Sequence, residues 1–175
     1  MLSSIVSVGI AWFLSIVFIA ALNHKVGSWP RFLAALSAYQ LLPSRFDKAT
    51  GGALVAAEVV TVLALLAGYP AGFFFAAILF TVYWVAMGVN LARGRTYIDC
   101  GCGDEPTRIG WGVLLRNGVL IALAVTGWLL EASSPGAPGY AVAVVLAVTG
   151  AAIYFALEQL LANVTTHRRL WLGES

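Results

Sequence analysis

Residues 50–91 read TGGALVAAEVVTVLALLAGYPAGFFFAAILFTVYWVAMGVNL, and this stretch decides the fold. It is too long for one membrane crossing, which needs about 20 predominantly apolar residues, and Glu58 is its single charged residue. The Gly-Tyr-Pro sequence at 68–70 interrupts the run, because proline cannot continue a helix and glycine relaxes the turn. The stretch therefore predicts a hairpin of two transmembrane helices, over residues 51–67 and 71–91.

Three further apolar runs flank this hairpin, at residues 1–22, 112–130 and 140–161. The first run carries no charge, and at about 1.5 Å per residue it spans the hydrocarbon core of a bilayer. It lacks the basic n-region of a signal peptide and is longer than the apolar region of one, so we expect it to be retained. Together with the hairpin, the three runs predict about five transmembrane helices. A loop over 133–139, rich in Ser, Gly and Pro, separates the last two.

The composition agrees with a membrane protein. Of 175 residues, 61% are hydrophobic and 10% are charged, which is too little charge for the surface of a soluble domain. The length fits one compact bundle without a separate soluble domain. We therefore expect an all-α fold with a single membrane domain over 1–175, built as a four-helix core plus one helix. Its location would be the inner (plasma) membrane of the cell.

The first loop, residues 23–50, differs from the apolar runs because basic residues lie among aromatic and aliphatic ones. Phe32, Leu36, Tyr39 and Phe46 recur at helical spacing, with Pro43 inside the series. This pattern predicts a short amphipathic helix at the membrane interface, broken near Pro43. The alternative is an ordinary polar loop that is anchored by buried side chains.

The positive charges are distributed very unevenly. All 10 lysines and arginines fall in or beside the first loop, the third loop and the C-terminal tail. With about five crossings these segments share one face of the membrane. The opposite face has no Lys or Arg, so the third loop is predicted to be cytoplasmic and the N-terminus to lie outside. The small net charge of +2 gives no reason to expect nucleic-acid binding.

The chain contains 2 cysteines, Cys100 and Cys102, which lie in the third loop with one glycine between them. A disulfide across a single residue closes a small, strained ring, and strain makes a disulfide more oxidising and easier to exchange. Closing so short a loop would add little stability. The pair therefore favours thiol-disulfide exchange. Arg95 and Arg108 would favour a thiolate in this loop, whereas Asp99, Asp104 and Glu105 would oppose one, so the sequence does not give the direction of any shift in the cysteine pKa.

Two other interpretations of the cysteines stay open. In the first, their thiolates bind a metal ion together with Asp99 or a histidine. Against it, His24 and His167 are remote in sequence and no set of four ligands is clustered. In the second interpretation both cysteines are inert loop residues, since free cysteine often behaves as a small hydrophobe.

Glu58 lies in the middle of a predicted helix, where an ionised carboxylate is costly, so we expect it to face the interior of the bundle. There it would be protonated, paired with a base of the first loop such as Lys25, or part of a cavity that accepts a proton or a quinone. The structural alternative is a hydrogen bond between helices. The sequence offers no Ser-His-Asp set, phosphate-binding loop or paired catalytic carboxylates, which argues against hydrolases and kinases.

The order of these features resembles the DoxX-like superfamily of small membrane proteins: an apolar first helix, a basic loop with Lys25 and Tyr-Gln-Leu-Leu-Pro at 39–43, a helix with Glu58, and a hairpin. The Asp-Cys-Gly-Cys-Gly turn at 99–103 narrows the resemblance to the family of the methylamine-utilisation protein MauE, over about residues 1–130.

This resemblance implies a role in maturing the small subunit of methylamine dehydrogenase, a periplasmic protein dense in disulfides, with a thioredoxin-like protein as partner. Cys100 and Cys102 would pass oxidising or isomerising equivalents between that partner and the membrane. A quinone near Glu58 is our hypothesis for the membrane step. A periplasmic client requires the cysteines outside, whereas the charge count places them inside. The alternatives from other classes are a membrane scaffold that docks a redox enzyme without turnover of its own, and a small-solute permease.

Overall fold

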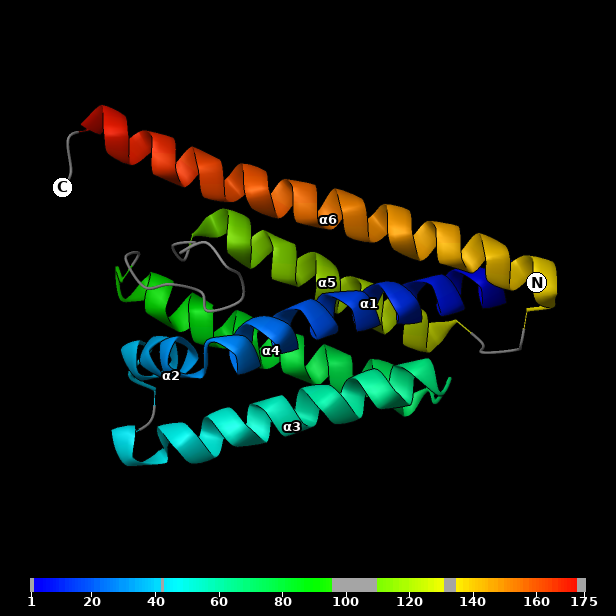
Figure 1. Cartoon of the computed structure of the whole chain (residues 1–175), viewed down its shortest axis with the longest axis horizontal. Helices are drawn as coiled ribbons and strands as arrows, with labels where there is room; N and C mark the ends of the chain where they lie inside the picture. Colours follow the sequence, from blue (N-terminus) through cyan, green and yellow to red (C-terminus); the bar gives the residue numbers. More distant parts are fainter. Residues whose placement is uncertain (1, 42, 96–109, 131–134, 173–175) are drawn as a thin grey trace.

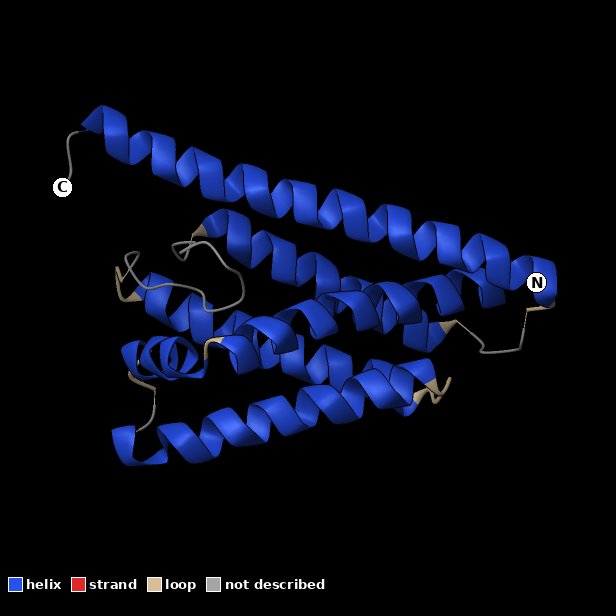
Figure 2. Cartoon of the chain, in the orientation of Figure 1, coloured by secondary structure: helices blue, strands red, loops and turns tan. Residues whose placement is uncertain are grey.

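The computed structural model describes residues 2–41, 43–95, 110–130 and 135–172, and it gives only the backbone of 161, 162 and 164–172. Every regular element in these ranges is helical (Figures 1 and 2). In chain order they are α1 (Leu2–Gly27), α2 (Trp29–Ala38), the short 3-10 helix η1 (Ser44–Phe46), α3 (Asp47–Leu66), α4 (Ala71–Ala92), α5 (Trp111–Leu129) and α6 (Ala137–Leu172).

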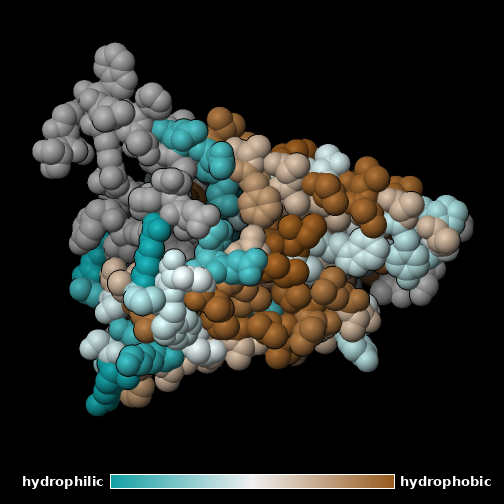
Figure 3. All heavy atoms as spheres, in the orientation of Figure 1, coloured by the Kyte–Doolittle hydropathy of each residue, from teal (hydrophilic) through white to brown (hydrophobic). Residues whose placement is uncertain are grey.

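Within the described residues, 5 helical stretches are long and apolar enough to cross a membrane: α1, η1 with α3, α4, α5 and the first part of α6. Many of their large apolar side chains are exposed, among them Val60, Leu63 and Val145, as expected where lipid is the solvent. Figure 3 shows apolar residues over the middle of the molecule and hydrophilic residues gathered toward the end that carries α2. The predicted all-α bundle with about five transmembrane helices and one shorter helix is confirmed.

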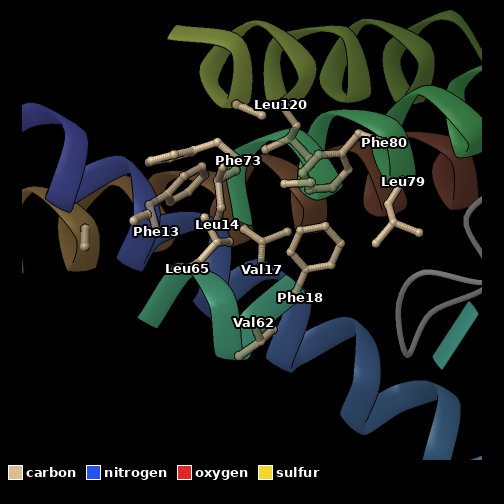
Figure 4. Packing of buried hydrophobic residues seen from close by; sticks show 14 of the residues in the cluster. Phe13, Leu14, Val17, Phe18, Val62, Leu65, Phe73, Leu79, Phe80 and Leu120 are labelled. Carbon is tan, nitrogen blue, oxygen red and sulfur yellow. The ribbon is translucent and has the colours of Figure 1, made fainter. Parts of the chain in front are cut away.

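Four helices form the core, and α6 lies beside them. Extensive contacts join α4 to α5, α3 to α4, and α1 to α3 and α5. α6 packs mainly along α1, and this interface is also extensive. Leu14 and Phe18 of α1 are fully buried in this core (Figure 4). The rings of Phe18 and Phe80 stack with their centroids 4.6 Å apart. This arrangement has the predicted form of four core helices plus one.

The turn between α3 and α4 follows the Gly-Tyr-Pro sequence. Gly68 has a φ of +76°, a left-handed conformation that glycine adopts without steric cost. Pro70 immediately precedes α4, where its fixed φ suits the start of a helix. Two residues later, a Cβ on Gly72 would lie 2.7 Å from the backbone nitrogen of Leu65. The two helices therefore approach as closely as they do because residue 72 has no side chain.

Three helices are longer than the sequence runs suggested, and one of them, α3, begins at Asp47 instead of residue 51 because it continues directly from η1. α1 continues from the predicted end at residue 22 to Gly27, because basic side chains in a last turn interact favourably with the helix dipole and no proline intervenes. α6 begins at Ala137 instead of 140, since Pro138 falls in the first turn, where proline is tolerated. It continues past the predicted end at 161 because no Gly or Pro interrupts the chain before residue 173.

The first loop contains the predicted short helix, in two pieces. α2 has Pro30 in its first turn and ends at Ala38, and Gln40 then takes a positive φ of +48°. Pro43 precedes η1, which leads directly into α3. The helix therefore ends a few residues before the proline at which the sequence placed the break. α2 packs against α3 and α1, and it buries Phe32 there.

Candidate functional site

Lys25, Glu58 and Tyr83 meet inside the bundle, each from a different helix. Lys25 lies in the last turn of α1, Glu58 in the middle of α3 and Tyr83 in the middle of α4. The ammonium group of Lys25 donates a hydrogen bond to Glu58 Oε1 in a buried ion pair. The Tyr83 hydroxyl donates to the same oxygen at 2.7 Å, and Lys25 Nζ lies 3.2 Å from that hydroxyl. We call these three residues the charged cluster.

The two charged residues of the cluster are almost closed to solvent, whereas Tyr83 is partly exposed. Glu58 has 0% of its surface exposed and Lys25 has 2%. The Lys25 ammonium also lies over two aromatic rings, 4.8 Å from the centroid of Tyr83 and 5.6 Å from that of Phe32. Such contacts stabilise a desolvated cation, and the carboxylate neutralises its charge. Of the alternatives open for Glu58, the structure therefore shows the pairing with Lys25.

One oxygen of the cluster has no polar contact within the part of the chain that the structure describes. Glu58 Oε2 is buried and finds no hydrogen-bond partner among the described residues. Buried polar atoms usually have a partner, so an orphan of this kind calls for a physical reason. In a membrane helix, a buried carboxylate oxygen of this kind marks a candidate functional site.

A pocket of about 170 Å³ adjoins the cluster beneath α2. Lys25 and Tyr83 supply polar groups to its wall, and most of the remaining wall is apolar. The lining residues come from four helices and the segment after α2: Lys25, Phe32, Ala35, Leu36, Tyr39, Leu41, Asp47, Thr50, Leu54, Val82, Tyr83, Ala86 and Met87.

A second ion pair joins α5 to α6. Arg116 donates to Glu158 Oε1, and the Arg116 guanidinium lies 5.6 Å from the centroid of the Tyr154 ring. These side chains are only partly buried, at 10% exposure for Arg116 and 19% for Glu158. Glu158 of α6 therefore contributes to the interface with α5.

Tyr83 is the member of the charged cluster that the sequence did not single out. A tyrosine within an apolar run is ordinary, because its ring belongs in a membrane helix. The sequence feature that could have identified Tyr83 is its position far from both ends of the 71–91 run. A hydroxyl at that depth needs a hydrogen-bond partner within the bundle.

The loop residues that the sequence assigned to redox chemistry are mostly outside the described residues. This holds for Cys100, Cys102, Asp99 and Arg108, whereas Arg95 is described and follows the end of α4. The described residues contain no group of three or more His, Cys, Asp and Glu side chains that would hold a metal ion. In Figure 1 the end of α4 and the start of α5 lie at the same end of the bundle as α2.

Comparison with known proteins identifies the family. Residues 3–130 match the family described as methylamine utilisation protein MauE. The chain belongs to the MauE family. It is 35% identical over 159 residues to the methylamine utilization protein MauE of Methylophilus methylotrophus, covering 87% of this chain and 75% of that protein. It is 34% identical over 129 residues to MauE of Paracoccus versutus, covering 71% of this chain and 69% of the relative.

The MauE match places α1 through α5 within the family region and leaves α6, which starts at Ala137, beyond it. Lys25, Glu58 and Tyr83 all lie inside the matched range. No solved structure matches the chain.

Proposed function

We propose that this protein acts in methylamine utilisation as a membrane thiol-disulfide redox protein that helps a partner protein form its disulfides. The observation that carries the proposal is that the chain has 2 cysteines, Cys100 and Cys102, separated by one glycine. The name of the family supports the metabolic context. The spacing supports exchange, because so short a ring is strained and its disulfide reacts readily with an incoming thiolate.

The exchange transfers one disulfide. A client thiolate attacks one sulfur of the Cys100–Cys102 disulfide and breaks the S–S bond, which gives a mixed disulfide and a free thiolate. A second client thiolate then attacks the client sulfur of the mixed disulfide. The client gains a disulfide, and both cysteines end as thiols after taking up two protons. The client has lost two electrons, so an acceptor of two electrons must restore the cysteine pair before the next turnover.

The partner implied by the family resemblance is a thioredoxin-like protein, and the client is a disulfide-rich periplasmic protein such as the small subunit of methylamine dehydrogenase. An inner-membrane location suits this role. A thioredoxin-like partner would carry the disulfide between the membrane and the client, since thiol exchange requires direct contact of the sulfur atoms.

Disulfide transfer to a reduced protein tests the proposal. The purified, oxidised protein in detergent micelles is mixed with reduced, unfolded ribonuclease A, and the free thiols of both proteins are counted over time. We expect the client to lose two thiols for every two that appear at Cys100 and Cys102.

Single substitutions supply the controls. Cys100→Ser or Cys102→Ser should abolish net transfer, because one remaining cysteine cannot form the internal disulfide that the client thiolate attacks. Transfer at the wild-type rate in the double variant would contradict the proposal and support the scaffold without turnover.

A further inference from the structure

We infer that the pocket beside Lys25 and Tyr83 binds the head group of a lipid-soluble quinone. The binding site stands on the described geometry, whereas the quinone's role as the acceptor of electrons from the cysteine pair rests on the proposed function. In that role the two thiols lose two electrons and two protons as their S–S bond forms. The quinone takes up these two electrons and two protons and becomes a quinol.

The size of the pocket fits one six-membered ring. Its volume is about 170 Å³. A cavity of about 150 Å³ lined by apolar side chains is sufficient to bind benzene. A whole drug-sized ligand needs about 300 Å³ or more, so only the head of a long molecule fits inside. Leu41 and Val82, which line the pocket and are exposed, form an apolar rim along which a tail would leave toward lipid.

The charges around the pocket select a neutral ligand. The positive charge of Lys25 is already balanced by Glu58, and the carboxylate of Asp47 also lines the pocket, so an anion would be opposed. A cationic ligand would compete with the Lys25 ammonium, which already occupies the faces of Tyr83 and Phe32. The remaining class is an uncharged ring that is soluble in lipid.

The polar groups of the pocket suit a ligand with carbonyl oxygens. An ammonium group has three N–H donors, and the contacts of Lys25 Nζ with Glu58 and Tyr83 use two of them. The third N–H is available to a carbonyl oxygen in the pocket that Lys25 lines. Glu58, in contact with the same lysine and tyrosine, holds both groups in place at the pocket wall. These features together favour a quinone over a plain hydrocarbon.

Photo-crosslinking with an azido-quinone tests the inference. The full-length protein in lipid nanodiscs is exposed to the probe, and decylubiquinone competes to give a Kd. Ala86→Trp fills the pocket from α4, and we expect it to remove the specific crosslink. Tyr83→Phe removes the hydroxyl that orients Lys25 and Glu58, and we expect it to weaken binding about tenfold, the change that a difference of about 1.4 kcal/mol produces.

Matched controls make the test decisive. Tyr154→Phe removes a hydroxyl that lines a separate pocket between α1, α5 and α6, and it should leave the Kd unchanged. If Ala86→Trp fails to fold, Ala35→Phe fills the same pocket from α2. The inference would be overturned if a folded pocket-filling variant and the separate Tyr83→Phe variant both crosslinked as strongly as the wild type. So would equal competition by dodecylbenzene, which has no carbonyl oxygen.

A variant with Cys100→Ser and Cys102→Ser separates this inference from the proposed function. Quinone binding without turnover needs no cysteine, so we expect the double variant to keep the wild-type Kd. Binding in a wild-type protein that transfers no disulfide would refute the redox function and leave the quinone site standing. Disulfide transfer without any specific quinone crosslink would refute the site and leave the redox function standing.

Discussion

Burial of Lys25 and Glu58 removes two full charges from water, and their ion pair offsets that cost only while both are present. Neither side chain has more than 3% of its surface exposed. Tyr83 binds the same carboxylate oxygen, so the cluster connects α1, α3 and α4 at one point. Removal of one charge should therefore affect the packing of three helices.

A double-mutant cycle measures this dependence. Lys25→Met leaves the carboxylate unpaired and Glu58→Gln leaves the ammonium unpaired, so each should lower the free energy of unfolding by about 3–5 kcal/mol. The variant with both changes should recover most of that loss, because no unpaired charge remains. Denaturant unfolding in detergent micelles, followed by circular dichroism, gives the four values.

The partly exposed pair of Arg116 and Glu158 is the comparison for this cycle. Its side chains are more exposed, at 10% and 19%, so Glu158→Gln should cost less than Glu58→Gln does. Additive losses in the Lys25 and Glu58 cycle, with the double variant as unstable as the sum of the single ones, would contradict the buried ion pair.

The sequence identified two members of the charged cluster and missed the third for a physical reason. A carboxylate in the middle of an apolar helix must face the interior, so Glu58 stood out and Lys25 was one of its expected partners. A tyrosine carries no such cost, and only the packing of α4 against α3 shows that the Tyr83 hydroxyl reaches the carboxylate.

Among the helices, the α3–α4 hairpin depends most directly on a single glycine. Gly72 faces the backbone of Ala64 and Leu65 at the end of α3, and a Cβ there would meet backbone atoms at 2.7–3.0 Å. Backbone cannot move aside as a flexible side chain does, so the helices would have to separate.

We therefore expect Gly72→Ala to lower the free energy of unfolding by about 1–3 kcal/mol, as overpacking does. Gly52→Ala is the matched control in α3, since a Cβ there meets nothing within 4 Å and alanine is the better helix former by about 0.5–1 kcal/mol. The melting temperature of each variant in micelles checks the difference. Equal stability of the two variants would refute the close approach.

Hydropathy was sufficient to find the membrane helices, but not their ends. Long apolar runs fix the number of crossings because each run must span the bilayer core. Helix ends depend on local chemistry instead. Lys25 extends α1 beyond its apolar run, and Pro138 sits inside the first turn of α6 although proline usually marks a loop.

Across the whole molecule, the described helices place the basic segments at one end. The first loop with α2, the end of α4, the start of α5 and the end of α6 lie together there, opposite the N-terminus and the α3–α4 turn (Figure 1). The sequence predicted this sharing of one end from the number of crossings. Which side of the membrane that end faces remains a prediction from the excess of Lys and Arg.

Thiol labelling in intact cells checks the orientation. In a variant without native cysteines, Tyr69→Cys marks the α3–α4 turn, where Tyr69 is 66% exposed, and Lys48→Cys marks the other end. We expect a membrane-impermeant maleimide to label residue 69 in intact cells and residue 48 only after lysis. The reverse pattern would place the third loop outside, on the side where a periplasmic client is found.

The redox state of Cys100 and Cys102 in living cells is the direct test of the proposed thiol-disulfide exchange. Cells are quenched with acid, and free thiols are then modified with a maleimide that carries a polyethylene glycol chain of known mass. The account predicts no adducts on the wild-type protein before reduction and two after it. It also predicts a mixed disulfide with a partner protein in Cys100→Ser or Cys102→Ser. Two adducts without any reductant, together with no mixed disulfide in either variant, would contradict it.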